Sequence, residues 1–169
     1  MLSSVAALLL LAAPPPEPPW SSLSFLAGLW DGVGSGAPGE GKGGFSFTPE
    51  LQGRVLVRRN YAEYPEAAGR AAFRHDDLTV IYRESADGPL RADYYDNEGH
   101  VIRYTVTTKG QTAIFLSEPV AGAPRYRLTY TSTGSDTLSI LFEIAPPGKP
   151  DAFQTYIEAK ARHAPAAAQ

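Results

Sequence analysis

Short runs of alternating apolar and polar residues recur from residue 28 to the end of the chain, and they predict β-strands. Side chains of a strand point to opposite faces in turn, so an apolar residue at every second position indicates one buried face. The clearest runs cover residues 45–48, 54–64, 78–84, 90–95, 100–108, 112–116, 126–131, 137–144 and 153–162. With a first strand that begins at Gly28, they make about ten strands joined by short turns.

The order of these strands favours an all-β fold, namely a single antiparallel up-and-down barrel. No helical pattern of about 10–15 residues separates the strands, and a closed barrel leaves no exposed strand edge. A β-sandwich is the alternative, but it needs long crossing connections, and none follows residue 53. Residues 20–27 predict one short helical turn, and the glycine-rich residues 32–44 predict a loop or a bulged strand edge.

One face of the strands is apolar and is expected to point into the barrel. It contains Val55, Val57, Tyr61, Leu78, Val80, Tyr82, Leu90, Tyr94, Ile102, Tyr104, Val106, Tyr126, Leu128, Tyr130, Leu138, Ile140 and Phe142. The other face is expected to meet water. It contains Arg58, Asn60, Arg83, Arg91, Asp93, Arg103, Thr105, Arg127, Thr129 and Glu143.

Tyrosine is frequent on the face expected inside, and this bears on function. A buried tyrosine hydroxyl needs a partner, so several of them indicate a lumen that holds a ligand or water. A narrow barrel filled by its own side chains is equally compatible with the pattern. Arg59 shares the inward parity, and a buried guanidinium demands an anionic partner, unless it reaches water at the barrel mouth. The candidate ligand-binding residues are Arg59, Tyr61, Tyr82, Tyr94, Tyr104, Tyr130 and Phe142.

Composition narrows the classes of partner. The chain has 169 residues, enough for about one domain with a real core, and a net charge of −3. Its basic residues are scattered, which disfavours nucleic acid as a partner. It has no cysteine, which excludes disulfides and thiol chemistry.

The N-terminus predicts export. Residues 5–13 are an unbroken apolar run, and residues 14–19 are proline-rich, so residues 1–13 resemble a signal peptide for a periplasmic or secreted protein. The run is shorter than the roughly 20 residues that span a bilayer. Residues 14–24 are expected to form a spacer and the helical turn, residues 25–163 the barrel, and residues 164–169 a tail. Trp20 stands at the end of the spacer and is expected at the surface.

Catalytic and metal-binding motifs are weak. Residues 34–39 match the pattern GxGxxG, but a strand-like run follows them where a nucleotide site needs a helix. His75, Asp76 and Asp77 are consecutive and cannot converge on one ion, and no HxH or HxxxH pair occurs. No serine lies in a GxSxG motif. We therefore assign no catalytic residue, metal or cofactor.

Several short motifs, Gly28-Leu29-Trp30, residues 53–57 and residues 95–99, together with a basic residue late in the last strand, resemble the calycin superfamily. This group includes lipocalins, fatty-acid-binding proteins and nitrobindin-like haem barrels, and a bacterial calycin-like family of unknown function is also similar. The resemblance implies that Trp30 closes the barrel under Arg162 or Lys160, which would need a bulge to turn inward. Nitrobindin-like barrels ligate haem through a histidine of the last strand. Residues 155–159 contain none, and Tyr156 has outward parity, so haem is a weaker expectation.

The leading hypothesis is a non-enzymatic exported barrel that binds a small apolar or amphipathic molecule in its lumen. One alternative is an isomerase or cyclase that uses buried Tyr and Arg side chains. A second alternative is a filled barrel that serves as a structural or interaction module.

Overall fold

The computed structural model describes residues 17–85 and 87–164. The predicted signal peptide, the first part of the spacer and residues 165–169 lie outside the described residues. The elements are η1 (Ser21–Leu26), β1 (Gly28–Gly36), β2 (Gly41–Glu50), β3 (Val55–Tyr64), β4 (Phe73–Arg83), β5 (Leu90–Asp96), β6 (Val101–Lys109), β7 (Thr112–Ser117), β8 (Arg125–Gly134), β9 (Thr137–Ala145) and β10 (Gln154–His163).

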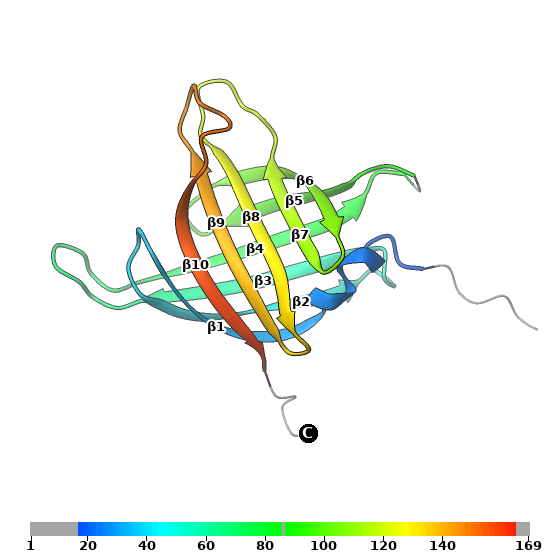
Figure 1. Cartoon of the computed structure of the whole chain (residues 1–169), viewed down its shortest axis with the longest axis horizontal. Coiled ribbons are helices and arrows are strands. Elements are labelled where there is room, and N and C mark those ends of the chain that lie inside the picture. Colours follow the sequence, from blue (N-terminus) through cyan, green and yellow to red (C-terminus); the bar gives the residue numbers. More distant parts are fainter. Residues whose placement is uncertain (1–16, 86, 165–169) are drawn as a thin grey trace, which may run out of the picture.

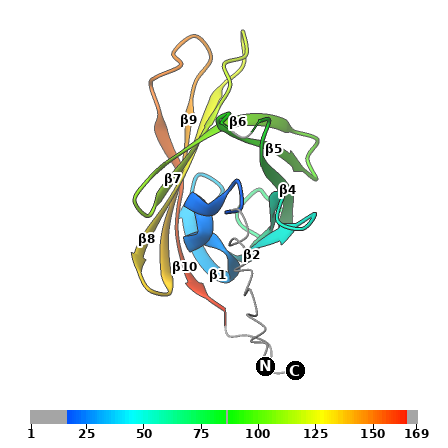
Figure 2. The same cartoon turned by 90° about the vertical axis from the view of Figure 1, so that its right-hand side faces the viewer.

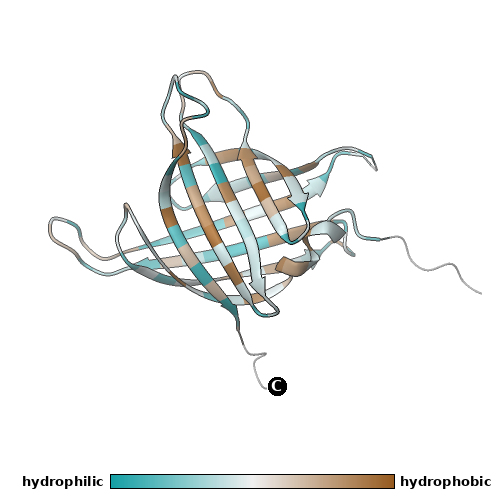
Figure 3. Ribbon diagram, viewed as in Figure 1, coloured by the Kyte–Doolittle hydropathy of each residue, from teal (hydrophilic) through white to brown (hydrophobic). Residues whose placement is uncertain are grey.

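The ten strands form one closed antiparallel barrel (Figure 1). Each strand pairs with its neighbours in sequence, and β1 also pairs with β10, so that Trp30 lies opposite His163 and Gly36 opposite Ile157. The described chain thus confirms the predicted up-and-down barrel with one short helical turn. Apolar and polar positions alternate along β8, β9 and β10, as the sequence pattern requires (Figure 3).

The glycine-rich residues 32–44 complete β1 and begin β2, so most of the segment is strand rather than loop. Here β10 carries a bulge at Tyr156, between the paired residues Thr155 and Ile157. The Tyr156 carbonyl accepts a hydrogen bond from the Ala37 N–H at 2.9 Å. A Cβ at Gly36 would lie 2.0 Å from that carbonyl oxygen, so only glycine fits there. The glycines therefore serve the close approach of strands at a sharp corner of the barrel.

The short helix η1 closes one end of the barrel (Figure 2). Leu23 and Leu26 are fully buried and join a core with Phe47, Leu56 and Ile81. The segment before η1 is tied to the end of β4, because the Arg83 guanidinium donates to the Pro19 carbonyl at 2.7 Å. The other end, where the β1–β2, β3–β4 and β5–β6 turns lie, has no such plug among the described residues.

The expectation that Trp20 lies at the surface is wrong. Its side chain is only 7% exposed, and its indole N–H donates to the Gly53 carbonyl at 3.0 Å in the β2–β3 turn. An alternating strand pattern does not predict the burial of Trp20, because this residue precedes every strand. η1 folds back over the barrel end, and Trp20 is buried there.

Trp30 is buried as expected, at 3% exposed, and its indole N–H donates to the Leu26 carbonyl at 2.9 Å. The residue of β10 that packs on it is His163, whose ring centroid lies 4.3 Å from that of Trp30. Arg162 is exposed and lies opposite Asp31, so its expected inward role is wrong. Residues 157–163 follow the bulge at Tyr156. Among them, Ala159 and Ala161 lie on the face that borders the lumen and core, and Lys160 and Arg162 do not.

We expect Trp20→Ala and Trp30→Ala each to lower the free energy of unfolding by about 3–5 kcal/mol, as for other large buried aromatics. Both remove a packed ring and leave a backbone carbonyl without its donor. Val120→Ala is the control, because Val120 lies in an exposed loop. Urea unfolding of the three variants measures this, and a silent Trp20→Ala would show that η1 does not close the barrel.

Gly36→Ala is expected to destabilise the protein by about 1–3 kcal/mol, because the new methyl group would overlap the Tyr156 carbonyl. The matched control is Gly32→Ala on the same face of β1, where the nearest atom lies at 3.4 Å. Its change should stay within about 1 kcal/mol. Equal effects in thermal or urea unfolding would contradict the role given to the corner glycines.

Candidate functional site

A cavity of about 480 Å³ occupies the lumen between the plugged end and the open end. Phe45, Arg58 and Tyr104 lie at its inner part, next to the apolar core. Its size falls within the range of about 300–1,000 Å³ that is usual for small-molecule sites. The lumen is therefore not filled by its own side chains.

The cavity has a polar wall formed by β3, β4 and β5. The Arg58 guanidinium forms a buried ion pair with the Asp77 carboxylate. Asn60 Nδ2 donates to the second oxygen of Asp77 at 2.8 Å. Burial is the largest single effect and alone would lower the pKa of Arg58. The charge of Asp77, together with Tyr130, Tyr94 and Tyr104, outweighs it, so that pKa lies above its ordinary value. The Arg58 guanidinium is therefore charged at neutral pH.

His75 connects this ion pair to the mouth of the cavity. Its Nε2 lies 3.0 Å from the Tyr94 hydroxyl and 3.4 Å from Asp77 Oδ2, and its Nδ1 lies 2.8 Å from Glu98 Oε1. The hydrogen bond with Asp77, together with the one with Glu98, outweighs burial and raises the pKa of His75 to about 9. The imidazole is therefore protonated at neutral pH, and both of its nitrogens donate.

Asp96 and His100 extend the polar wall to the open end. The Tyr94 hydroxyl donates to Asp96 Oδ2 at 3.0 Å, and His100 Nδ1 lies 2.8 Å from the same oxygen. Burial acts to raise the pKa of Asp96, but hydrogen bonds from the His100 backbone, its ring and Tyr94 outweigh burial and lower that pKa. Hydrogen bonds thus connect Asp77 to Asp96 through His75 and Tyr94.

The buried tyrosines hold neutral phenols. Burial, then the charges of Asp77 and Asp96, raise the pKa of Tyr94, and burial likewise raises the pKa of Tyr104. Burial also raises the pKa of Tyr130 to about 12. The Tyr130 hydroxyl and Arg58 Nε are buried and have no hydrogen-bond partner among the described residues.

The opposite wall, formed by β8, β9 and β10, is apolar. It is lined by Tyr126, Leu128, Ile140, Phe142, Ile144, Tyr156, Ile157 and Ala159. The rings of Tyr126 and Phe142 are stacked, with centroids 6.0 Å apart and planes 7° from parallel. Tyr156, turned toward the cavity by the bulge, meets Phe142 edge to face at 6.0 Å.

Only some of the residues expected to bind a ligand line the cavity. Tyr94, Tyr104 and Phe142 line the cavity, whereas Tyr130 is fully buried and does not line it. Tyr61 borders the cavity but is 37% exposed, with the Arg74 guanidinium over its ring. Whether any of them binds a ligand stays a prediction.

The inward orientation expected for Arg59 and Tyr82 is wrong. The Arg59 side chain is 61% exposed and lies 3.7 Å from Glu50, and the Tyr82 hydroxyl donates to Asp93, on the face expected outside. The register between β2 and β3 determines which side chains of β3 point inward, because Phe47 and Phe45 of the core lie opposite Arg58 and Asn60. The inner face of β3 is therefore the set expected outside, and on β4 Asp77, Thr79 and Ile81 point inward.

Sequence reasoning therefore missed Arg58, His75 and Asp77. A polar lumen wall reverses the usual pattern, so apolar residues mark the outer face of β3 and β4. The neighbouring strand could have revealed them. Phe45 and Phe47 of β2 face inward, and pairing across the β2–β3 hairpin places Arg58 and Asn60 on the same face.

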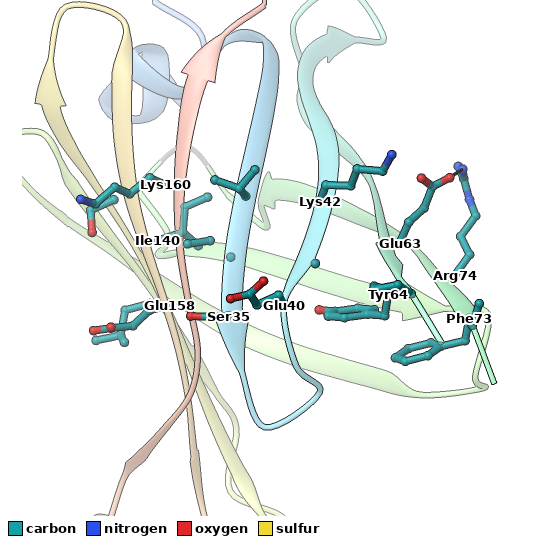
Figure 4. A pocket seen from close by; sticks show the side chains of 18 residues that line it. Ser35, Glu40, Lys42, Glu63, Tyr64, Phe73, Arg74, Ile140, Glu158 and Lys160 are labelled. Atoms are coloured by element: carbon teal, nitrogen blue, oxygen red, sulfur yellow. Dashed lines mark hydrogen bonds and ion pairs between the residues drawn. The ribbon is translucent and has the colours of Figure 1, made fainter. Parts of the chain in front are cut away.

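A second, more open depression of about 1,180 Å³ lies over the β1–β2 hairpin (Figure 4). Lys42, Glu63, Arg74, Glu158 and Lys160 stand around it, with signs mixed. Arg74 and Glu63 form an exposed ion pair at 3.1 Å. Such pairs and mixed charges are typical of a solvated surface, so we assign no site there.

Residues 17–85 and 87–164 contain no cluster of three or more His, Asp or Glu side chains arranged to hold a metal ion. None of the helical structure in these ranges is both long and apolar enough to cross a bilayer.

No family model and no curated protein matches the chain. Among solved structures it is similar to a de novo designed fluorescence-activating β-barrel. The two share 11% sequence identity with a TM-score of 0.46, over 85% of this chain and 97% of the designed one. The likeness is to the barrel alone.

We expect Arg58→Met to lower the free energy of unfolding by about 3–5 kcal/mol, because it leaves the buried Asp77 carboxylate without its main counter-charge. Arg59→Met is the matched control one residue away, and it should change stability by less than about 0.5 kcal/mol. Urea unfolding compares the two. Similar effects would contradict the inward placement of Arg58.

Stability should fall as the pH rises, through His75. The folded pKa of about 9 lies above the ordinary 6.5, so the stabilisation is complete below pH 6.5 and is lost as the pH rises through about 9. We expect the parent to lose about 1–3 kcal/mol over this window relative to His75→Gln. Urea unfolding between these limits measures it, and parallel curves for the two proteins would contradict the contacts described for His75.

Proposed function

We propose that this protein binds a small apolar or amphipathic molecule in its lumen and has no catalytic role. The observation that carries the proposal is the cavity of about 480 Å³ with a charged wall on β3–β5 and an apolar wall on β8–β10. An apolar pocket with a few fixed polar groups is the usual form of a small-molecule site.

The buried Arg58–Asp77 pair supports the proposal further. Two charges inside a barrel cost several kcal/mol in lost hydration, and an apolar pair of the same volume is often as stable or more so. A polar wall in the interior is therefore better explained by what it contacts than by the stability of the barrel.

The isomerase or cyclase alternative has less support. A tyrosine that exchanges protons near neutral pH needs a lowered pKa, whereas the pKa values of Tyr94, Tyr104 and Tyr130 are raised. The interaction-module alternative expects a filled barrel, and the cavity speaks against it.

Export and membership of the calycin superfamily remain part of the proposal. The apolar run of residues 5–13 and the proline-rich segment after it support export. The Gly28-Leu29-Trp30 motif, with Trp30 buried at the closed end, supports the resemblance to calycins. Cell fractionation with N-terminal sequencing of the mature protein tests export.

Native mass spectrometry of the protein purified from its own host tests ligand binding. We expect an added mass that denaturation releases. Leu128→Trp fills the lumen from β8, and it should abolish the added mass. Thr129→Trp, the next residue on the opposite face of β8, should retain it.

Circular dichroism and unfolding must first show that both variants are folded. A parent that carries no added mass, and that also fails to bind the apolar probe N-phenyl-naphthylamine, would contradict the proposal. Equal retention in Leu128→Trp and Thr129→Trp would place the ligand outside the lumen.

A further inference from the structure

We infer that the ligand is an uncharged, planar aromatic molecule that carries a hydroxyl or carbonyl oxygen at its edge. The inference rests on the proposed function and narrows its ligand class. Three features of the lumen lead to it: the pairing of its charges, the division of its walls and the aromatic rings of the apolar wall.

The charges inside the lumen are already matched. Arg58 pairs with Asp77, and protonated His75 lies 2.8 Å from Glu98. Asp96 accepts hydrogen bonds from Tyr94 and from the His100 backbone and ring. Of the charged side chains that border the cavity, only Lys42 lacks such a contact among the described residues, and it is exposed.

Apart from the exposed Lys42, a charged ligand would therefore find no free counter-charge in the lumen. It would have to break one of these pairs or remain buried without a partner, and either costs several kcal/mol. A neutral oxygen avoids this cost. The polar side chains of Arg58, His75 and Tyr94 line the cavity and can contact such an oxygen.

The division of the walls determines the shape of the ligand. Polar side chains follow one side of the lumen from Arg58 to Asp96, and apolar ones follow the opposite side from Leu128 to Ile144. β4 and β9 stand on opposite sides of the ten-strand ring. A ligand in this space meets polar groups along one edge or face and apolar groups along the other. An acyl chain with a single polar head does not match that division.

The aromatic side chains of the apolar wall favour a flat molecule. The stacked rings of Tyr126 and Phe142, with Tyr156 edge-on beside them, present π-surfaces to the cavity. Such rings gain from offset or edge contacts with another ring beyond the area they bury.

Three probes test the inference at pH 7 by fluorescence titration and displacement: 9-anthracenemethanol, 9-anthracenecarboxylate and decanol. The first two share one ring system and differ in charge, and the third is an uncharged alcohol without a ring. We expect 9-anthracenemethanol to bind at least tenfold more tightly than either of the others.

A ring-deletion variant tests the aromatic wall. Phe142→Leu keeps an apolar side chain but removes the ring, so binding of 9-anthracenemethanol should weaken about three- to tenfold while that of decanol stays unchanged. Tyr95→Leu, on the exposed outer face of β5, is the matched control and should leave both affinities as in the parent.

Tighter binding of the carboxylate would overturn the uncharged class, and tighter binding of decanol would overturn the planar class. Both results would leave the proposed lumen binding intact. If none of the three probes binds to protein that circular dichroism shows to be folded, the proposed function fails together with this inference.

Discussion

The ion pair between Arg58 and Asp77 is the interaction on which the rest of the lumen depends. It lies where the apolar core ends and the cavity begins, with the Arg58 guanidinium 5.5 Å from the Phe45 ring centroid on one side and Asn60 bonded to Asp77 on the other. A guanidinium in such a place needs an anion, and the anion in turn needs donors. Asn60 and His75 supply them, and His75 brings Tyr94 and Glu98 into the same network.

The two ends of the barrel differ in their packing, since one is filled by side chains and the other holds the cavity. At the closed end, η1 and two tryptophans complete a dry core, and both indole N–H groups satisfy backbone carbonyls. Burial of this core contributes hydrophobic stabilisation at the closed end, and the cavity lies toward the open end. The glycines of β1 and β2 let neighbouring strands approach closely and turn sharply.

Much of the fold follows from the sequence, since alternation, turn residues and the lack of helical segments all predict an up-and-down barrel. The inner faces of β5, β6 and β8 also follow, through Tyr94, Tyr104 and Leu128. The faces of β3 and β4 do not, because hydrophobic alternation assumes an apolar interior and this wall is polar. If the apolar side chains of these strands are assigned to the interior, the inner face is shifted by one residue. Arg59 is then chosen in place of Arg58, and Asp77 is missed.

The closed end shows the same limit. Trp30 could be assigned from its motif, but its partner His163 could not, because the pairing of β1 with β10 joins residues more than a hundred positions apart. Trp20 could not be assigned either, since its burial depends on a turn between β2 and β3. Contacts of this kind are set by register and chain reversal, which a local pattern does not contain.

The central claim is that the buried ion pair serves the ligand site rather than the stability of the barrel. The double variant Arg58→Met/Asp77→Leu tests it most directly, because it replaces both charges with apolar side chains. We expect its urea unfolding free energy to equal or exceed that of the parent, as for other buried pairs replaced together, while 9-anthracenemethanol binds at least tenfold more weakly. A double variant that binds the probe as tightly as the parent would contradict the account.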